Sequence, residues 1–450
     1  MLTRLQNIDT IVTCDPNDHL YFHTDLWFED GQILCIGDCE RTPDAAYDCS
    51  GMIVYPGLIN VHHHLYQYFT RNLQKVQNYE LFDWLKALYG VWKNLNEKTV
   101  LLSSCAGMAE LMRYGCTTCF DHHYVFPQHA GDLLAAQFEA ADVLGIRMHA
   151  SRGSMDLSEK DGGLPPDSVV QTVDEILKDS EDDIRRYHDR NRYSMRQIVL
   201  APCSPFSASE TLYRESAALA RQYGVHLHTH LCETKDEEAY TLSVFGKRPY
   251  DYIASLGWTG PDVFYAHGIH FNDRELDDIA AAGTGIAHCP VSSMKLSSGV
   301  MRLPDMLDRG ITVGLAVDGS ASNDGSDLMD EMRVAYLVHR LTWGNRAPNG
   351  YGILKAATAG SAKVLGRDDL GSIEPKKAAD VFAIRKNSTD LLCAIDDPMN
   401  LFGTVGYHRP CDLVFVNGKL TVQDGRLTGL DEDALLYLSR QELGRLLSNL

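Results

Sequence analysis

Short apolar runs alternate with amphipathic segments over most of the middle of the chain. The apolar runs are strand-like and lie near 53–61, 116–120, 146–151, 197–203, 225–231, 263–267, 284–289 and 311–317. Between most of them, apolar residues recur with helical spacing, as in 100–114, 132–144, 209–223 and 273–282. Eight strands joined by helical crossovers predict an α/β fold, a parallel (β/α)8 TIM-type barrel over residues 56–370.

The two ends of the chain follow a different pattern, in which short alternating runs are separated by turn residues. Asp30-Gly31 and Asn417-Gly418 each separate two such runs, as is typical of two-residue β-hairpins. Pieces on either side of one barrel combine most simply into a single unit. Residues 1–55 and 371–428 are therefore predicted to form one small β-sandwich domain, and residues 429–450 to contain a C-terminal helix.

Composition excludes several classes of protein. The 450 residues carry 41 Lys and Arg against 61 Asp and Glu, a formal net charge of −20, which argues against a nucleic-acid backbone or an anionic membrane as partner. No apolar run approaches the roughly 20 residues of a membrane-spanning helix, and the first residues lack the apolar core of a secretion signal. The 12 cysteines are scattered, which favours free thiols and a cytoplasmic location.

The predicted strands end in residues that can bind metal, and the active site of such a barrel lies at these ends. The first strand ends in three consecutive histidines. Because side chains alternate along a strand, His62 and His64 share one face and the middle histidine points away. His230 ends the fifth strand and Asp318 the eighth. Three imidazoles and one carboxylate are a suitable ligand set for a catalytic divalent metal such as zinc.

Other interpretations of single residues stay open. Any one histidine alone could be a hydrogen-bonded core or surface residue. His228 shares a face with His230 but lies two residues deeper, so it could be a ligand or only packing support. Glu233 could reach a metal-bound water or substrate, or only stabilise the start of a helix. Serine-hydrolase and P-loop interpretations fail because the chain has no G-x-S-x-G and no G-x-x-x-x-G-K.

These motifs together resemble a known family. The segment from Pro56 to His64, with His230-Leu231-Cys232-Glu233, Ala266-His267 and Val317-Asp318-Gly319, resembles the amidohydrolase superfamily in its cytosine, guanine and triazine deaminase branch. The resemblance covers essentially the whole chain, including the split β-domain. By position it implies four metal ligands, which are His62, His64, His230 and Asp318.

The resemblance also implies a catalytic arrangement around one metal ion. Glu233 and His267 act with Asp318 in proton transfer, and the cofactor is one divalent ion, Zn²⁺ by first expectation and Fe²⁺ as the alternative. Binuclear members of the superfamily bridge two metals with a carboxylated lysine at the end of strand four. This chain has no lysine between Lys178 and Lys235, so a mononuclear site is expected.

The implied reaction is hydrolytic deamination of a small aromatic heterocycle, after a metal-activated water attacks its amino-bearing ring carbon. Longer segments are similar to those of members that deaminate an oxidised purine, which implies conversion of 8-oxoguanine to urate and ammonia. These segments are 62–67, 81–86, 151–155, 161–166 and 266–271. The resemblance places Gln67 and Arg152 in substrate binding. From the residues alone, purely structural roles stay open. Gln67 could simply form hydrogen bonds with the backbone, and Arg152 could simply form an ion pair with an acidic residue.

Several alternatives accompany this interpretation. Isoxanthopterin, guanine-type compounds and triazines are alternative substrates for the same machinery. Some proteins with this fold have lost their ligands and are not catalytic, but here the whole set of ligands and acid–base residues is present, which indicates an enzyme. We expect no nucleic-acid or membrane partner, and we expect a homo-oligomer.

Overall fold

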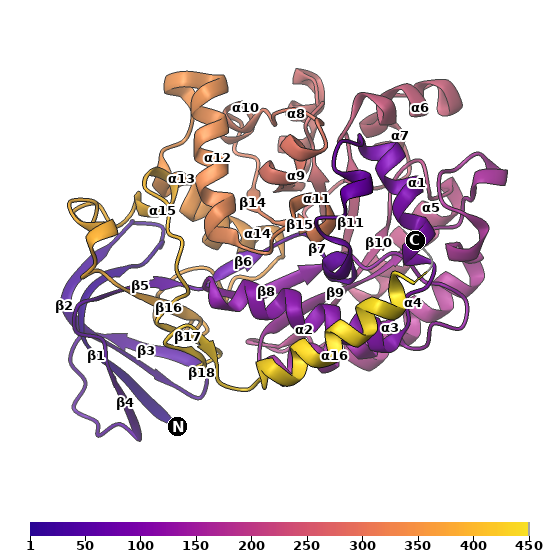
Figure 1. Cartoon of the computed structure of the whole chain (residues 1–450). Helices are drawn as coiled ribbons and strands as arrows, with labels where there is room; N and C mark the ends of the chain where they lie inside the picture. Colours follow the sequence, from indigo (N-terminus) through magenta and orange to yellow (C-terminus); the bar gives the residue numbers. More distant parts are fainter. Residues whose placement is uncertain (449–450) are drawn as a thin grey trace.

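The computed structural model describes residues 1–448 and contains a barrel beside a second sheet (Figure 1). Strands from both ends of the chain share the second sheet, in the order β19-β18-β17-β16-β5-β1-β2-β3, with β4 paired to β1. Their bounds are β1 Leu2–Val12, β2 Leu20–Glu29, β3 Gln32–Ile36, β4 Ala45–Asp48, β5 Met52–Pro56, β16 Val381–Arg385, β17 Leu413–Val416, β18 Lys419–Gln423 and β19 Arg426–Leu427. The antiparallel pairing of β5 with β16 joins the two ends of the chain.

Both expected hairpins are present in this sheet. The turn between β2 and β3 has φ 49° at Asp30 and 84° at Gly31, and the turn between β17 and β18 has φ 49° at Asn417 and 73° at Gly418. Positive φ at both central residues matches the right-handed twist of the flanking strands, which is why Asp-Gly and Asn-Gly are favoured there.

Eight parallel strands form the barrel, in the order β14-β13-β12-β11-β10-β9-β8-β6. Their bounds are β6 Leu58–Asn60, β8 Cys116–Asp121, β9 Arg147–Ser154, β10 Arg196–Pro202, β11 His226–Leu231, β12 Val263–His267, β13 Gly285–His288 and β14 Val313–Leu315. The ring is closed where β15 (Asp318–Gly319) pairs in parallel with β7 (His63–His64). The predicted barrel is confirmed, and its closing seam carries two of the expected site residues.

Helices cover the outside of the barrel (Figure 1). They are α1 Leu81–Trp92, α2 Glu97–Arg113, α3 Leu133–Leu144, α4 Val173–Tyr187, α5 Glu210–Tyr223, α6 Lys235–Phe245, α7 Pro249–Ser255, α8 Asp273–Ala282, α9 Pro290–Lys295, α10 Leu303–Asp308, α11 Ser320–Asn323, α12 Leu328–Trp343, α13 Gly350–Lys355, α14 Ser361–Val364, α15 Leu401–Thr404 and α16 Glu432–Leu446. Helix α16 lies along α2; the last two residues of the predicted C-terminal segment lie outside the described residues.

Apolar side chains fill the space between strands and helices, while a polar network occupies the bottom of the barrel. Met148 and Ala150 of β9 pack in the outer layer with helix residues such as Phe138. At the start of the same strand, Arg147 is fully buried and forms an ion pair with Asp380 beside β16. This pair ties the barrel to the sheet formed by both ends of the chain.

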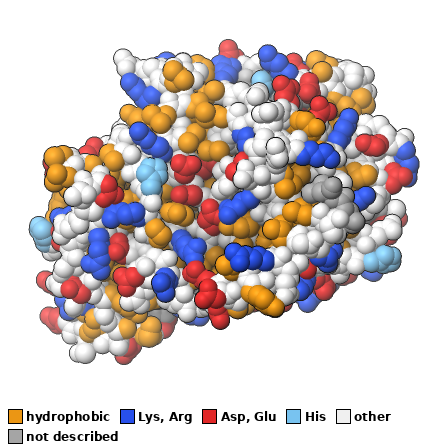
Figure 2. All heavy atoms as spheres, viewed as in Figure 1, with side chains coloured by type: hydrophobic (Ala, Val, Ile, Leu, Met, Phe, Trp, Pro, Cys, Tyr) orange, Lys and Arg blue, Asp and Glu red, His pale blue; other side chains and the backbone are white. Residues whose placement is uncertain are grey.

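The surface mixes charges of both signs. On the face shown in Figure 2, acidic and basic side chains are interspersed and separate the exposed apolar residues. Among the helices of residues 1–448, none is both long and apolar enough to span a membrane.

Candidate active site

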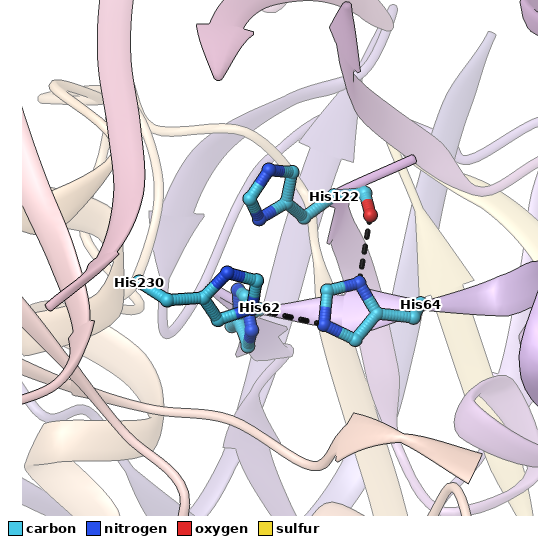
Figure 3. A group of neighbouring side chains, drawn as sticks. All are labelled: His62, His64, His122 and His230. Carbon is cyan, nitrogen blue, oxygen red and sulfur yellow. Dashed lines mark hydrogen bonds between the residues drawn. The ribbon is translucent and has the colours of Figure 1, made fainter. Parts of the chain in front are cut away.

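Three of the predicted ligands converge above the closing seam of the barrel (Figure 3). The imidazoles of His64 and His230 face each other with their Nε2 atoms 3.2 Å apart, and the ring of His62 lies beside them. His62 lies between β6 and β7, His64 ends β7, and His230 lies in β11, 166 residues after His64. All three are buried.

Hydrogen bonds fix which nitrogen of two of these rings faces the centre. Nδ1 of His64 lies 2.7 Å from the carbonyl oxygen of His122, and Nδ1 of His230 lies 2.7 Å from the carbonyl oxygen of Cys203. A carbonyl only accepts, so each Nδ1 carries the proton and donates it. The neutral ring then has its lone pair on Nε2, as a metal ligand requires.

His228 orients the ring of His62. Of the two roles considered for His228, metal ligand or packing support, the structure shows the supporting one. Nδ1 of His228 lies 3.0 Å from the carbonyl oxygen of Phe264 and must donate to it. The Nε2 of neutral His228 therefore accepts from Nδ1 of His62, at 2.9 Å. The Nε2 of His62 is left with its lone pair, buried and without a hydrogen-bond partner.

Asp318 lies at the spacing of metal ligands from two of the three histidines. Its Oδ1 lies 3.4 Å from Nε2 of His62 and 3.3 Å from Nε2 of His64. Ligands about 2.0–2.1 Å from a tetrahedral Zn²⁺ ion are about 3.3–3.4 Å from one another. The residues present fit a divalent metal ion.

A fourth histidine, His122, lies in this cluster, although no role was predicted for it. Its ring stacks on that of His230 with centroids 4.7 Å apart, and its Nε2 donates to the carbonyl of Ala201 at 3.0 Å. His122 therefore supports His230 with its ring and His64 with its carbonyl. Its position directly after β8 is the sequence signal that could have identified it.

Glu233 and His267 lie on one side of the metal-binding atoms. Oε2 of Glu233 is 3.5 Å from Nε2 of His267. Burial raises the pKa of Glu233 well above its usual range, and the negative charges of Asp318 and Glu237 raise it further. A raised pKa favours the protonated carboxyl group, the state in which it can donate a proton.

The position of Glu233 depends on a second carboxylate that sequence reasoning missed. Glu237, in the first turn of α6, accepts from the backbone N–H of Cys232 at 3.0 Å and from that of Glu233 at 2.8 Å. Cys232 has a φ of 54°, a strained conformation for a residue with a side chain. Asp318 and His267 are strained in the same way, with φ of 63° and 75°. Three of the strand ends that carry this site therefore have a strained backbone.

A small cavity of about 30 Å³ opens beside these groups. Its apolar wall consists of Leu81, Trp84, Leu85, Tyr124, Phe206 and Leu296. Gln67 also lines it, and both polar atoms of its buried amide lack a hydrogen-bond partner. A Cβ atom at position 319 would lie 2.0 Å from Oε1 of Gln67, so Gly319 permits the amide to lie directly beside Asp318. The cavity combines a flat apolar wall with unpaired amide groups.

The structure does not bring Arg152 to this cavity. Its guanidinium lies over the ring of Phe126 at 3.8 Å, donates to Gln171 at 2.8 Å and pairs with Asp179 at 3.2 Å. On β9 it shares a face with Met148, which packs in the outer apolar layer. The alternation of side chains along the strand is the signal that could have shown Arg152 pointing away from the barrel axis.

This fold and site define a metal-dependent hydrolase, and comparisons with known proteins place it more closely. The sequence profile described as "Amidohydrolase family" matches residues 53–421. The chain is 44% identical to 8-oxoguanine deaminase from Pseudomonas aeruginosa (94% of this chain, 95% of that protein) and 38% identical to hydroxydechloroatrazine ethylaminohydrolase from Pseudomonas sp. strain ADP (94% and 91%). Among solved structures, zinc-complexed atrazine chlorohydrolase from Arthrobacter aurescens TC1 superimposes with a TM-score of 0.94 at 30% identity, covering 98% of this chain and 100% of that one.

The chain therefore belongs to the amidohydrolase family. Within that family it is a metal-dependent deaminase, a hydrolase that acts on C–N bonds. The predicted family and the predicted class of enzyme are confirmed.

Proposed function

We propose that this enzyme hydrolyses 8-oxoguanine to urate and ammonia. The observation that carries the proposal is the buried amide of Gln67, which has no hydrogen-bond partner among residues 1–448 and lines the cavity next to Asp318. An unpaired amide donor and acceptor match the carbonyl and N–H edge of an oxopurine, and leaving them unpaired would cost free energy. Similarity to the Pseudomonas aeruginosa enzyme supports the same substrate.

Trp84 adds a second polar contact for the ring. It is buried, lines the cavity, and its Nε1 has no hydrogen-bond partner. An indole N–H only donates, so it suits a carbonyl oxygen of the heterocycle. Tyr124 and Phe206 line the apolar faces on which a flat ring can rest.

Glu233 and Asp318 carry out the proton transfers. His62, His64, His230 and Asp318 would hold a divalent cation, which we propose to be zinc, and the bound ion would act as a Lewis acid towards water. Asp318 takes the proton of the attacking water, helped by His267. Glu233 protonates the ring nitrogen next to the amino-bearing carbon. Asp318 then passes the proton taken from water to the leaving nitrogen, which departs as ammonia, and Glu233 accepts the hydroxyl proton as the ring carbonyl forms.

Ser322 holds the reacting carboxylate in place. Its hydroxyl can donate to Oδ2 of Asp318 at 3.2 Å or to the carbonyl oxygen of Gly319 at 2.9 Å, while Oδ1 of the carboxylate faces the histidines. The two oxygens of Asp318 thereby have separate surroundings, one next to the metal ligands and the other next to the cavity. This division suits a residue that both binds the cation and accepts a proton.

The test is ammonia release by the metal-replete enzyme from 8-oxoguanine, guanine, isoxanthopterin, cytosine and an aminotriazine. We expect a clear preference for 8-oxoguanine, together with one zinc ion per chain by elemental analysis. Preference for another ring would overturn the proposed substrate, and iron in active enzyme would overturn the proposed metal. Absence of ammonia from every ring would contradict the proposed set of substrates as a whole.

A further inference from the structure

A second cavity lies directly outside the catalytic one and shares a wall with it. This outer cavity, termed the vestibule, has a volume of about 480 Å³, against about 30 Å³ for the catalytic cavity. Leu81 and Leu296 line both cavities. Their side chains are nearly buried, with 7% and 3% of the residue surface exposed. Two leucines thus separate a narrow reaction chamber from a much wider space.

The two leucines come from distant parts of the chain. Leu81 is the first residue of α1. Leu296 directly follows α9, the short helix that comes after strand β13. Consecutive residues also line the two cavities, since Glu233 lines the catalytic cavity and Thr234 lines the vestibule. A substituent that extends from a ring bound beside Glu233 towards this side would meet the leucines first.

Polar groups line the vestibule. Glu80, Asp236 and Lys235 face it, and so does Ser298. Ser298 is 6% exposed and its buried Oγ has no hydrogen-bond partner among the described residues. Two carboxylates beside one lysine disfavour an anion such as phosphate. Sugar hydroxyls both donate and accept hydrogen bonds, so they match this mixture of acids, an ammonium group and a hydroxyl.

We propose that Leu81 and Leu296 determine substrate specificity by closing the catalytic cavity against the vestibule. They restrict the enzyme to the free heterocycle, and the vestibule accommodates the ribose of the corresponding nucleoside once the wall is shortened. This inference rests on the proposed function, because it takes the heterocycle as the ligand of the catalytic cavity. It adds a physical reason why the free base, and not its nucleoside, is the substrate.

The experiment compares wild type with the double variant Leu81→Ala, Leu296→Ala. The specificity constant kcat/KM is measured by ammonia release for 8-oxoguanine and for its ribonucleoside, 8-oxoguanosine. Wild type should favour the base by at least about a hundredfold, and the double variant should raise the ratio of nucleoside to base by at least about tenfold. Should another ring of the panel be the substrate, that ring and its N-ribosyl form are compared in the same way.

Two further variants separate this effect from general loosening of the fold. Leu242→Ala, at an exposed leucine of α6, should leave the ratio unchanged. Ser298→Ala in the double-variant background should lower kcat/KM for the nucleoside and spare that for the base. If the double variant does not fold, Leu296→Ala alone, checked by thermal unfolding, should still raise the ratio.

Each outcome bears on one of the two proposals. Equal use of base and nucleoside by wild type would overturn the inference. So would an unchanged ratio in a folded variant that still deaminates the base, and in that case the proposed function would stand. No ammonia from any ring with wild type would overturn the proposed function and this inference with it.

Discussion

The two ends of the barrel hold buried polar networks of opposite kinds. At the rim, where the strands end, Gln67, Trp84 and His62 have buried polar atoms without a hydrogen-bond partner in the described part of the chain. At the floor, where the strands begin, Arg147 bonds Thr118, the carbonyl of Ser194 and Asp380, which leaves one terminal nitrogen unpaired.

A second buried ion pair at the floor is also hydrogen-bonded within the fold. Arg367 donates to both oxygens of Asp369, at 2.8 and 2.9 Å, and to the carbonyl of Ser194. A buried polar atom without a partner costs about 1–3 kcal/mol, and strained backbone adds to that cost. Most polar atoms of these two arginines avoid the cost because they are hydrogen-bonded within the fold. Groups at the rim bear it where a ligand can pair with them.

The sharpest test of the rim is Glu233→Gln. The amide cannot act as the proton donor, so kcat should fall by about a thousandfold or more, while the protein keeps its metal and its thermal stability. Steady-state kinetics and elemental analysis measure both quantities. Near-normal deamination by this variant would remove Glu233 from the mechanism.

The matching test of the floor is Arg147→Met. It leaves Asp380 as an unpaired buried carboxylate, so the free energy of unfolding should fall by about 3–5 kcal/mol, with kcat of the folded fraction nearly unchanged. Denaturant unfolding and activity at low temperature give the two values. Arg274→Met, which removes a largely exposed partner of Asp251, is the control and should change stability little. Loss of kcat without loss of stability would contradict the distinction between the two ends.

Gln67→Leu tests whether an unpaired rim group serves a ligand. No hydrogen bond of its side chain within the protein is lost, so stability should stay the same or rise. The specificity constant for the substrate should fall by about a hundredfold, because the ring loses its amide partner. Kinetics and thermal unfolding of one preparation decide the matter. A destabilised but fully active variant would show that Gln67 is structural.

Glu237→Gln should have a smaller effect, because Glu237 acts through Glu233. Its amide can accept from only one of the two backbone N–H groups that the carboxylate now binds. A small shift of Glu233 should lower kcat by about tenfold and leave KM nearly unchanged. A rise in KM with an unchanged kcat would argue against this positioning role.

The same variant has a pH signature. Burial raises the pKa of Glu237 to about 7 in the folded protein, against the lowering effect of its backbone hydrogen bonds. The folded state therefore holds this proton more tightly than the unfolded state, so its contribution to stability is complete below about pH 4.5 and is lost as pH rises to about 7. Wild type should lose stability relative to Glu237→Gln over that interval, as measured by denaturant unfolding at several pH values. A pH-independent difference would contradict the raised pKa.

Gln67 and Arg152 show where sequence reasoning reached its limit. Both were placed at the substrate by resemblance, and both are buried polar residues near strand ends. Arg152 finds partners in Gln171 and Asp179, which lie 19 and 27 residues further along the chain. Gln67 finds none, since Gly319 leaves room for its amide beside Asp318. Alternation along β9 could have placed Arg152 away from the barrel axis, but that Gln67 faces the catalytic cavity depends on neighbours that no local pattern specifies.

The sequence by itself determined the elements and the residue types at their ends. Strand and helix periodicity, the Asp-Gly and Asn-Gly turns, and the histidines and aspartate at strand ends all depend on neighbouring residues, and parallel strands bring their carboxyl ends to one rim. The tertiary structure alone decided which nitrogen of each histidine is free, that His228 orients His62, and that Leu81 and Leu296 form one wall. These features depend on distances of a few ångströms between residues far apart in the chain, and packing of the whole fold sets those distances.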